Sequence, residues 1–153
     1  MEDMTQYPLE LTGDVPMVRF CNVTKSYGAL VVLASLNLDI QAGEMVSIIG
    51  PSGSGKTTVL RMLMTLEKIN GGVIYLDGKP MTHMPKNGVL VPATEKYIRS
   101  VKGDIGMCFQ HFNLFPHMTA LQNCIEAPVQ VLGMSKKDAI ERAEEMLDMV
   151  GLA

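Results

Sequence analysis

Tryptophan is absent from the sequence, and aromatic residues make up only 5% of its 153 positions. No apolar run approaches the roughly 18 residues that a membrane-spanning helix needs, so the sequence predicts no segment that crosses a bilayer. The three cysteines, Cys21, Cys108 and Cys124, form neither a C-x-x-C pair nor a disulfide framework. We therefore expect reduced thiols, as in a cytosolic protein.

An excess of charge of either sign is also absent. The net charge is −3 and no basic stripe occurs, which removes the electrostatic argument for nucleic-acid binding. The first residues are acidic and lack the apolar core of a signal peptide. Hydrophobic residues at 47% and charged residues at 19% are typical of one globular domain. We expect a loose polar leader over 1–14 and the domain over 15–153.

The sequence does contain a phosphate-binding loop pattern: a glycine, four free positions, then glycine, lysine and threonine. Its glycines can take positive φ and let backbone N–H groups approach an anion, next to the positive end of a following helix. Lys56 supplies a charge for phosphates and Thr57 a hydroxyl for Mg²⁺. The motif consists of Gly50, Pro51, Ser52, Gly53, Ser54, Gly55, Lys56, Thr57 and Thr58.

The flanks of this loop support the pattern. The apolar run Glu44–Ile49 predicts a buried parallel strand, and Thr58–Met64 predicts a helix with Val59, Met62 and Leu63 on one face. Strand, loop and helix is the context that a phosphate-binding loop requires. The alternative is a glycine- and serine-rich surface turn that happens to contain a lysine.

Further elements follow from alternation, turn residues and caps. We expect an irregular segment over 79–93, because it contains Pro80, Pro85 and Pro92. We expect turns at Thr24–Gly28, Ala42-Gly43 and Asp77-Gly78. The expected strands are Met17–Val23, Val31–Ile40, Val73–Leu76 and Ile105–Phe109, and the expected helices are Glu95–Val101, one from Thr119 to Gly133 kinked at Pro128, and one from Ser135 to Gly151.

Tyr27 is an aromatic residue in a polar stretch ahead of the phosphate loop. An exposed ring there could stack on an adenine face, an interaction of roughly 1–3 kcal/mol for base–aromatic pairs. The alternative is a tyrosine packed at a strand end with its hydroxyl in water. Spacing leaves both open.

Gln110 stands where the expected strand Ile105–Phe109 ends. Ligands gather at the carboxyl ends of strands in doubly wound sheets, so its amide could orient water or reach a metal. The alternative is a loop glutamine in solvent. His83, His111 and His117 lack the spacing of a metal site, and we expect none of them to be catalytic.

Taken together, the chain resembles the N-terminal half of an ATP-binding cassette (ABC) ATPase, the motor subunit of a membrane transporter. The resemblance is carried by Tyr27-Gly28, the loop 50–58 and Ile105–Gln110, and it covers residues 16–153. The run Phe109–Thr119 is similar to the glutamine loop of importers for polar amino acids and compatible solutes such as ectoine. Two departures are mild: Cys108 replaces the usual branched aliphatic residue, and Thr57 replaces the commoner serine.

The resemblance implies an α/β fold of the P-loop NTPase type, with an antiparallel β subdomain, part of a parallel core sheet over about 15–110, and the start of a helical subdomain over about 110–153. It implies ATP and Mg²⁺ as cofactors. Tyr27 would stack on adenine, the loop 50–58 would hold the triphosphate with Lys56 on the β/γ oxygens, Thr57 would bind Mg²⁺, and Gln110 would touch Mg²⁺ or the attacking water.

The resemblance also implies partners and a location. A homodimer of ATPase subunits would bind membrane-spanning subunits on the cytoplasmic face of the membrane, and indirectly serve a solute-binding protein. The family's signature segment, acidic strand end and switch histidine should follow Ala153. Without them we expect a fragment that binds ATP, hydrolyses it poorly, and folds poorly alone because a strand edge stays open.

Two other hypotheses remain. The chain could be a catalytically silent nucleotide-binding or regulatory module, or a small-molecule kinase. A kinase should have an arginine-rich lid, and the few arginines of the sequence argue against one; they are Arg19, Arg61, Arg99 and Arg142.

Overall fold

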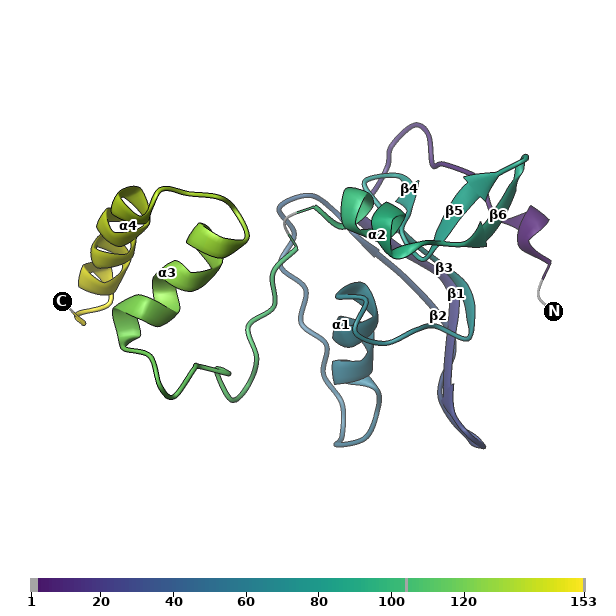
Figure 1. Cartoon of the computed structure of the whole chain (residues 1–153). Coiled ribbons are helices and arrows are strands. Elements are labelled where there is room, and N and C mark those ends of the chain that lie inside the picture. Colours follow the sequence, from purple (N-terminus) through teal and green to yellow (C-terminus); the bar gives the residue numbers. More distant parts are fainter. Residues whose placement is uncertain (1–2, 104, 153) are drawn as a thin grey trace. The chain divides into compact units, whose positions relative to one another are not determined.

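The computed structural model describes residues 3–103 and 105–152 (Figure 1). Residues 1–107 and residues 108–153 form two compact units, and each has a hydrophobic core of its own. No helix within the described ranges combines the length and the apolar composition that crossing a membrane would take.

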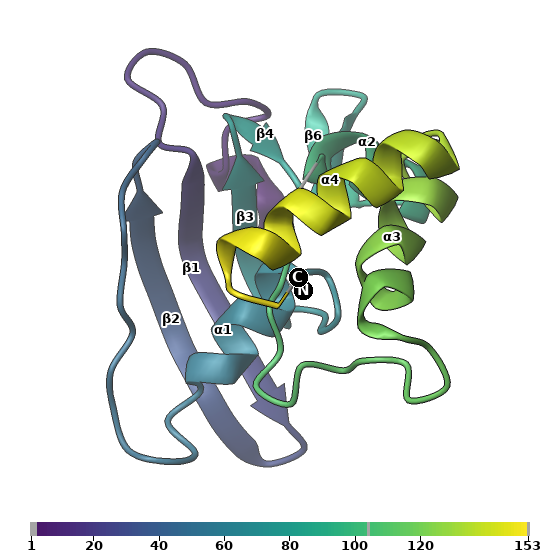
Figure 2. The same cartoon turned by 90° about the vertical axis from the view of Figure 1, so that its left-hand side faces the viewer.

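A four-stranded antiparallel sheet forms the centre of the first unit (Figure 2). Its strands lie in the order β2-β1-β3-β4. The expected strands at the start of the chain and after the loop are confirmed, because their alternating residues face two different layers. The strands are β1 (Val18–Tyr27), β2 (Leu30–Ile40), β3 (Gly71–Leu76) and β4 (Lys79–Pro80).

The turn expected over Thr24–Gly28 is wrong for most of its length. β1 continues through Tyr27, and the chain reverses at Gly28 and Ala29. The polar residues remain in the strand because partners on both sides bind their backbone. Ser26 N–H donates to Asn70 Oδ1 at 2.7 Å, and Asn70 N–H donates to the Thr24 carbonyl oxygen at 2.9 Å.

A bulge interrupts β1 at Cys21 and Asn22, where β1 holds one residue more than the facing stretch of β2. Asn22 takes a φ of +48°. Its N–H donates to Asn37 Oδ1 at 2.9 Å, and Asn37 Nδ2 donates back to Asn22 Oδ1 at 3.0 Å. Gly72 on β3 permits this approach, since a Cβ there would lie 2.5 Å from the Asn22 carbonyl oxygen.

The bulge shifts the alternation of β1 by one residue. Before it, Phe20 faces one layer of the unit; after it, Val23 and Lys25 are the buried residues on that same side. Tyr27 follows Lys25 by two positions and therefore shares its face. Without the extra residue, Lys25 and Tyr27 would point to the opposite side of the sheet.

Two helices cover this face of the sheet. Helix α1 (Lys56–Leu63) buries Val59 and Met62 against Phe20 and its neighbours, and Leu63 packs beside them, as the sequence predicts. Helix α2 (Glu95–Lys102) begins at Thr94, whose side chain accepts from Tyr97 N–H, and ends at Gly103. These caps confirm the expected helix boundaries.

The opposite face is covered by the N-terminal segment and a hairpin. Tyr7, beside the short 3₁₀ helix η1 (Met4–Gln6), is 7% exposed and packs in a cluster with Val73, Tyr75 and Leu90. The Tyr75 hydroxyl donates to the Pro8 carbonyl oxygen at 2.7 Å. The expected loose leader is not loose at Tyr7 and Pro8, where a buried tyrosine side chain and a part-buried hydrogen bond join it to β3.

The irregular segment expected over residues 79–93 is wrong. They contain β4 and the hairpin of β5 (His83–Lys86) and β6 (Val89–Pro92). Asn87 and Gly88 form its two-residue turn with φ values of +52° and +79°, a turn type that suits a hairpin. Proline has no N–H to donate to a neighbouring strand. Both strands of this two-stranded sheet are edge strands, so the sheet tolerates proline.

Two expected buried strands do not form. Residues 44–49 and 105–109 have no strand assignment, and Met45 and Ile49 are 94% and 91% exposed. A parallel strand needs neighbours on both sides for its backbone groups. Within the described residues no strand lies beside either stretch, and all the strand pairs there are antiparallel. The expected partial parallel sheet is therefore wrong for the described chain.

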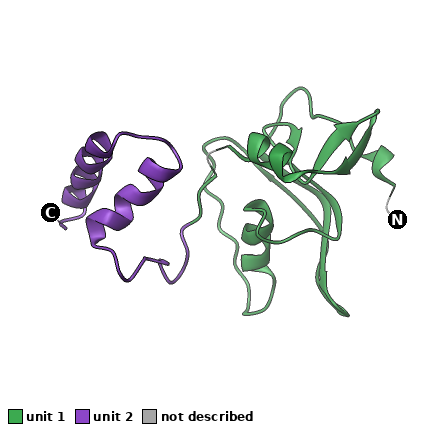
Figure 3. Ribbon diagram, viewed as in Figure 1, with its two compact units in different colours: residues 1–107 green, residues 108–153 purple. Residues whose placement is uncertain are grey.

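The second unit is a helix pair (Figure 3). Helix α3 (Ala120–Gln130) begins with the predicted capping box of Thr119 and Gln122, and it contains Pro128. Helix α4 (Lys136–Met149) begins at Ser135, as predicted. Ile125, Ala139 and Ala143 form the core of the pair, whereas Met146 and Val150 are exposed.

Candidate functional site

The loop at residues 50–55 leads directly into α1, whose first residue is Lys56. Gly50, Gly53 and Gly55 have φ values of +155°, +82° and +87°, which other residues rarely adopt. Gly55 is the N-cap and provides no side-chain hydrogen bond to the first turn. The N-terminal N–H groups of α1 are therefore not capped by a side chain, as an anion site at a helix N-terminus requires.

Lys56 crosses this loop. Its Nζ donates to the carbonyl oxygens of Gly50 at 2.9 Å and Pro51 at 2.6 Å, and it lies 3.4 Å from Ser54 Oγ. The three acceptors come from the loop itself, and the residues around them are exposed. The ammonium group is therefore held at the loop by neutral acceptors, which a phosphate oxygen can replace.

The end of the loop is packed against the sheet. A Cβ on Gly55 would lie 2.9 Å from Val32 Cγ1 and 3.3 Å from Leu33 Cδ2. At the other end, a Cβ on Gly50 would lie 2.9 Å from Ser54 Oγ. A side chain at Gly55 would press on the sheet, and the positive φ at both positions favours glycine.

The same contacts bring Tyr27 to the side of the sheet where the loop lies. Leu33, which contacts Gly55, pairs with Lys25 on β1. Tyr27 is two residues further along, about 7 Å at the usual rise per residue. The structure therefore gathers Tyr27 and the end of the loop over neighbouring positions of β1 and β2.

Tyr27 is 44% exposed, and its ring lies against Lys25, whose Nζ is 4.6 Å from the ring centroid. Lys25 is only 7% exposed and forms an ion pair with Glu67 at 3.1 Å. Neither Lys25 nor Glu67 is expected from the sequence pattern. The signal in the sequence is the spacing of Lys25 and Tyr27, which puts them on one face of a strand rather than in a turn.

The remaining predicted site residues are Thr57, Thr58 and Gln110. Thr57 and Thr58 follow Lys56 in the first turn of α1, where the Thr57 side chain is exposed. Gln110 is an exposed turn residue of the second unit, so it belongs to a different compact body from the loop. Within residues 3–103 and 105–152 no cluster of histidine, cysteine and acidic side chains could hold a metal ion.

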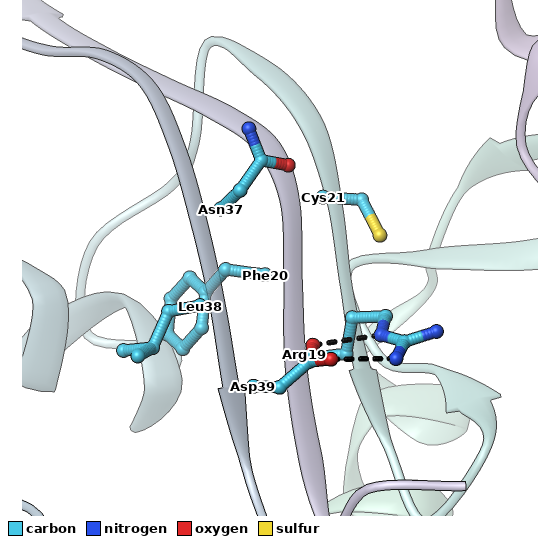
Figure 4. A pocket seen from close by; sticks show the side chains of 6 residues that line it. All are labelled: Arg19, Phe20, Cys21, Asn37, Leu38 and Asp39. Atoms are coloured by element: carbon cyan, nitrogen blue, oxygen red, sulfur yellow. Dashed lines mark hydrogen bonds and ion pairs between the residues drawn. The ribbon is translucent and has the colours of Figure 1, made fainter. Parts of the chain in front are cut away.

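A hollow of about 460 Å³ lies elsewhere on the first unit, beside β1 and β2. Figure 4 shows Arg19 and Asp39 joined across it; Arg19 Nε donates at 2.7 Å and Nη2 at 2.6 Å to the two carboxylate oxygens. These bonds hold the pKa of Asp39 below its usual value. Burial raises the pKa of Cys21 nearby, so its thiol is less acidic than usual. The hollow's charged groups satisfy each other, and no residue of the phosphate loop lines it.

Residues 33–153 match the family model described as "ABC transporter". Among curated proteins, the probable amino-acid ABC transporter ATP-binding protein y4tH of Sinorhizobium fredii is 56% identical over 136 residues, which is 89% of this chain and 53% of that protein. The glutamine transport ATP-binding protein GlnQ of Bacillus subtilis is 46% identical over 136 residues, 89% of this chain and 52% of that protein.

Solved structures show the same likeness. The dimeric ATP-binding cassette MJ0796, in a post-hydrolysis state bound to ADP and Pi, superposes with a TM-score of 0.69 at 37% identity. The match covers 87% of this chain and 56% of that one. The chain thus spans about half the length of the relatives it matches.

Proposed function

The chain belongs to the ABC transporter family, and from this premise we propose that it binds ATP as part of the ATP-hydrolysing subunit of an importer for amino acids or related compatible solutes. One observation carries the proposal: the loop at residues 50–55 ends on a glycine N-cap, and Lys56 extends over it. The curated relatives' names supply the solute class, because both are described as amino-acid or glutamine transport proteins.

Each group of the loop has a task in holding a triphosphate. Backbone N–H groups at the start of α1 donate to phosphate oxygens, aided by the helix dipole. Lys56 exchanges its bonds to the carbonyl oxygens of Gly50 and Pro51 for bonds to the β- and γ-phosphates. The exchange replaces neutral acceptors by charged ones, which form stronger hydrogen bonds.

We further propose Mg²⁺ as the cofactor that accompanies ATP. Thr57 presents an exposed hydroxyl oxygen beside Lys56, a ligand type that suits a hard cation. Gln110 would supply an amide oxygen or orient the attacking water. When bound, Mg²⁺ would supply positive charge that neutralises charge developing on the phosphates. The task of Thr57 and Gln110 is to hold the metal and the water, and that of Lys56 is to hold the phosphates.

The proposed assembly is a pair of ATPase subunits on the cytoplasmic face of the membrane, bound to membrane-spanning subunits that receive solute from a solute-binding protein. Its support is that the relatives are named as transport proteins and that the solved relative is dimeric.

The test is Lys56→Ala with ATP and Mg²⁺ in isothermal titration calorimetry. Loss of the charge-assisted hydrogen bonds should weaken binding by about 1.5–3 kcal/mol, or roughly 10- to 100-fold. Lys86→Ala is the matched control, since Lys86 is an exposed lysine on β5. Equal dissociation constants for Lys56→Ala and the unaltered chain would refute the proposal.

A further inference from the structure

We propose that Lys25 and Glu67 are positioning residues that hold the ring of Tyr27 so that one face is presented to the adenine base of ATP. The inference rests on the proposed ATP binding and on the expectation, implied by the family resemblance, that Tyr27 stacks on adenine. It adds to that function two residues that do not touch the nucleotide and that act through Tyr27. It is carried by the contacts of a buried ammonium group under an exposed ring.

The Lys25 ammonium group has three partners: a backbone carbonyl, a carboxylate and an aromatic ring. It donates to the Lys68 carbonyl oxygen at 2.7 Å, lies 3.1 Å from a Glu67 carboxylate oxygen, and lies 4.6 Å from the centroid of the Tyr27 ring. The Lys25 side chain is only 9% exposed. A buried ammonium group has little freedom to move, because moving away from its partners would leave its charge without compensation.

This arrangement gives the two faces of the Tyr27 ring different neighbours. The ammonium covers one face, within the distance at which a cation is attracted to a ring. Tyr27 is nevertheless 44% exposed, so part of its surface remains open to a ligand. A planar base can stack only on the face that Lys25 leaves open.

Glu67 anchors the Lys25 ammonium group. It forms an ion pair with the Lys25 ammonium group at 3.1 Å, and Lys25 is the main reason that the pKa of Glu67 lies below its usual value. Glu67 also lies 3.5 Å from Arg61 Nη2, in the last turn of α1. Lys25 therefore lies over the ring and is itself held by Glu67, which is joined to the helix that starts at the phosphate loop.

A purely structural role for Lys25 would tie residues 67–70 to β1 and do nothing else. That role predicts a loss of stability, or an equal loss of affinity for any ligand of the phosphate loop. A positioning role predicts a loss only for ligands that carry a base. Ordering the ring before binding lowers the entropy that stacking would otherwise cost.

The experiment compares ATP with inorganic tripolyphosphate, both with Mg²⁺, by isothermal titration calorimetry. Lys25→Met should weaken ATP roughly three- to tenfold, the range expected for a cation–π contact of this burial, and leave tripolyphosphate within about twofold. Lys25→Arg keeps a cation that stacks on the ring and should restore most of the ATP affinity. In a Tyr27→Ala background, Lys25→Met should cause no further loss, because the ring through which it acts is gone.

Equal losses for ATP and tripolyphosphate in Lys25→Met, or no loss for either, would overturn the proposal. If Tyr27→Ala leaves the ratio of the two affinities unchanged, Tyr27 is not the adenine site and the proposal fails, while the Lys56→Ala result still decides ATP binding by the loop. Should Lys25→Met not fold, Glu67→Gln replaces it, since glutamine keeps an acceptor for Lys25. Its ATP affinity should fall roughly two- to threefold with tripolyphosphate unchanged, and any other pattern contradicts the proposal.

Discussion

Two lysines of the first unit show how the surroundings of an ammonium group decide its use. Lys56 donates to two backbone carbonyl oxygens of an exposed loop, partners that a charged ligand outcompetes. Lys25 is 7% exposed and its partners include a carboxylate. The first can change partners when a phosphate arrives, whereas the second stays in place and fixes its neighbours.

At the residue scale, we predict that Asp39→Asn lowers stability at pH 7 but not in acid. The hydrogen bond from Arg19 lowers the pKa of Asp39 below its usual 3.8. A carboxylate with a lowered pKa stabilises the fold above the unfolded value, and this contribution disappears as the pH falls through the folded value. The Asp39 side chain is 43% exposed, so we expect a loss of no more than about 1 kcal/mol.

The measurement is urea unfolding at pH 7 and at pH 3 for Asp39→Asn and the unaltered chain. Glu95→Gln is the control, because the Arg99–Glu95 ion pair has side chains 80% and 88% exposed and should contribute little at either pH. A difference between Asp39→Asn and the unaltered chain that is as large at pH 3 as at pH 7 would show that charge pairing is not its cause.

At the element scale, the bulge of β1 depends on the glycine opposite it. Gly72 has φ of +82°, and a Cβ there would lie 2.5 Å from the Asn22 carbonyl oxygen. We predict that Gly72→Ala destabilises the first unit by more than about 2 kcal/mol, since it adds a backbone clash to an unfavourable φ. The free energy of unfolding in urea measures this.

Gly88→Ala separates the two contributions. Gly88 has φ of +79° in the β5–β6 turn, but nothing lies within 4 Å of its Cβ position. It should therefore show only the cost of a left-handed alanine, about 1–2 kcal/mol. Similar losses at the two positions would mean that the bulge relaxes to admit a side chain.

The antiparallel strands and the caps are predictable because their causes are local in the sequence. Alternation predicts β2, and Thr94, Thr119 and Ser135 each cap the helix that the sequence assigns to them. The β5–β6 hairpin was missed because its prolines outweighed the Asn87-Gly88 turn signal. An edge strand accepts proline, so the turn residues are the stronger signal here.

The failures at 44–49 and 105–109 have a different origin. An apolar run forms a buried strand only where other strands lie beside it. In the described chain Met45 and Ile49 are among the most exposed apolar residues. Whether such a run forms a strand depends on partner strands far away in the sequence, and the composition of the run carries no information about them.

The candidate site also has a part that the sequence predicts and a part that it does not. The phosphate loop is predictable because its residues are contiguous and each type has a local task. Lys25 and Glu67 are not, because they come together only after β1 pairs and the segment following α1 folds back on it. The sequence leaves two roles open for Tyr27, and the contacts of Lys25 support our proposal that its ring is presented to adenine.

At the scale of the whole molecule, the two compact units predict a pattern of proteolysis. The chain after residue 107 runs through residues 109–118 without helix or strand, and Phe112 and Leu114 there are 75% and 65% exposed. We predict that brief chymotrypsin treatment cuts first in this stretch, because exposed backbone outside regular structure fits a protease active site. Mass spectrometry of the fragments identifies the bonds.

Phe20 and Tyr75 serve as internal controls, since they are 2% and 1% exposed and lie in paired strands. Early cleavage after either residue would mean that the first unit opens as readily as the connecting stretch. In that case the division into two separately stable units would be wrong.

The extra residue in β1 has a consequence for how this strand can change in evolution. Phe20 and Tyr27 lie on the same face of β1 although they are seven positions apart, and the bulge is what makes this possible. Removing one residue between them would turn the ring toward the β5–β6 layer, and a second change of one residue would turn it back. Substitutions are therefore tolerated here more readily than single insertions or deletions, and an aligned relative should keep the parity of this spacing even where its residues differ.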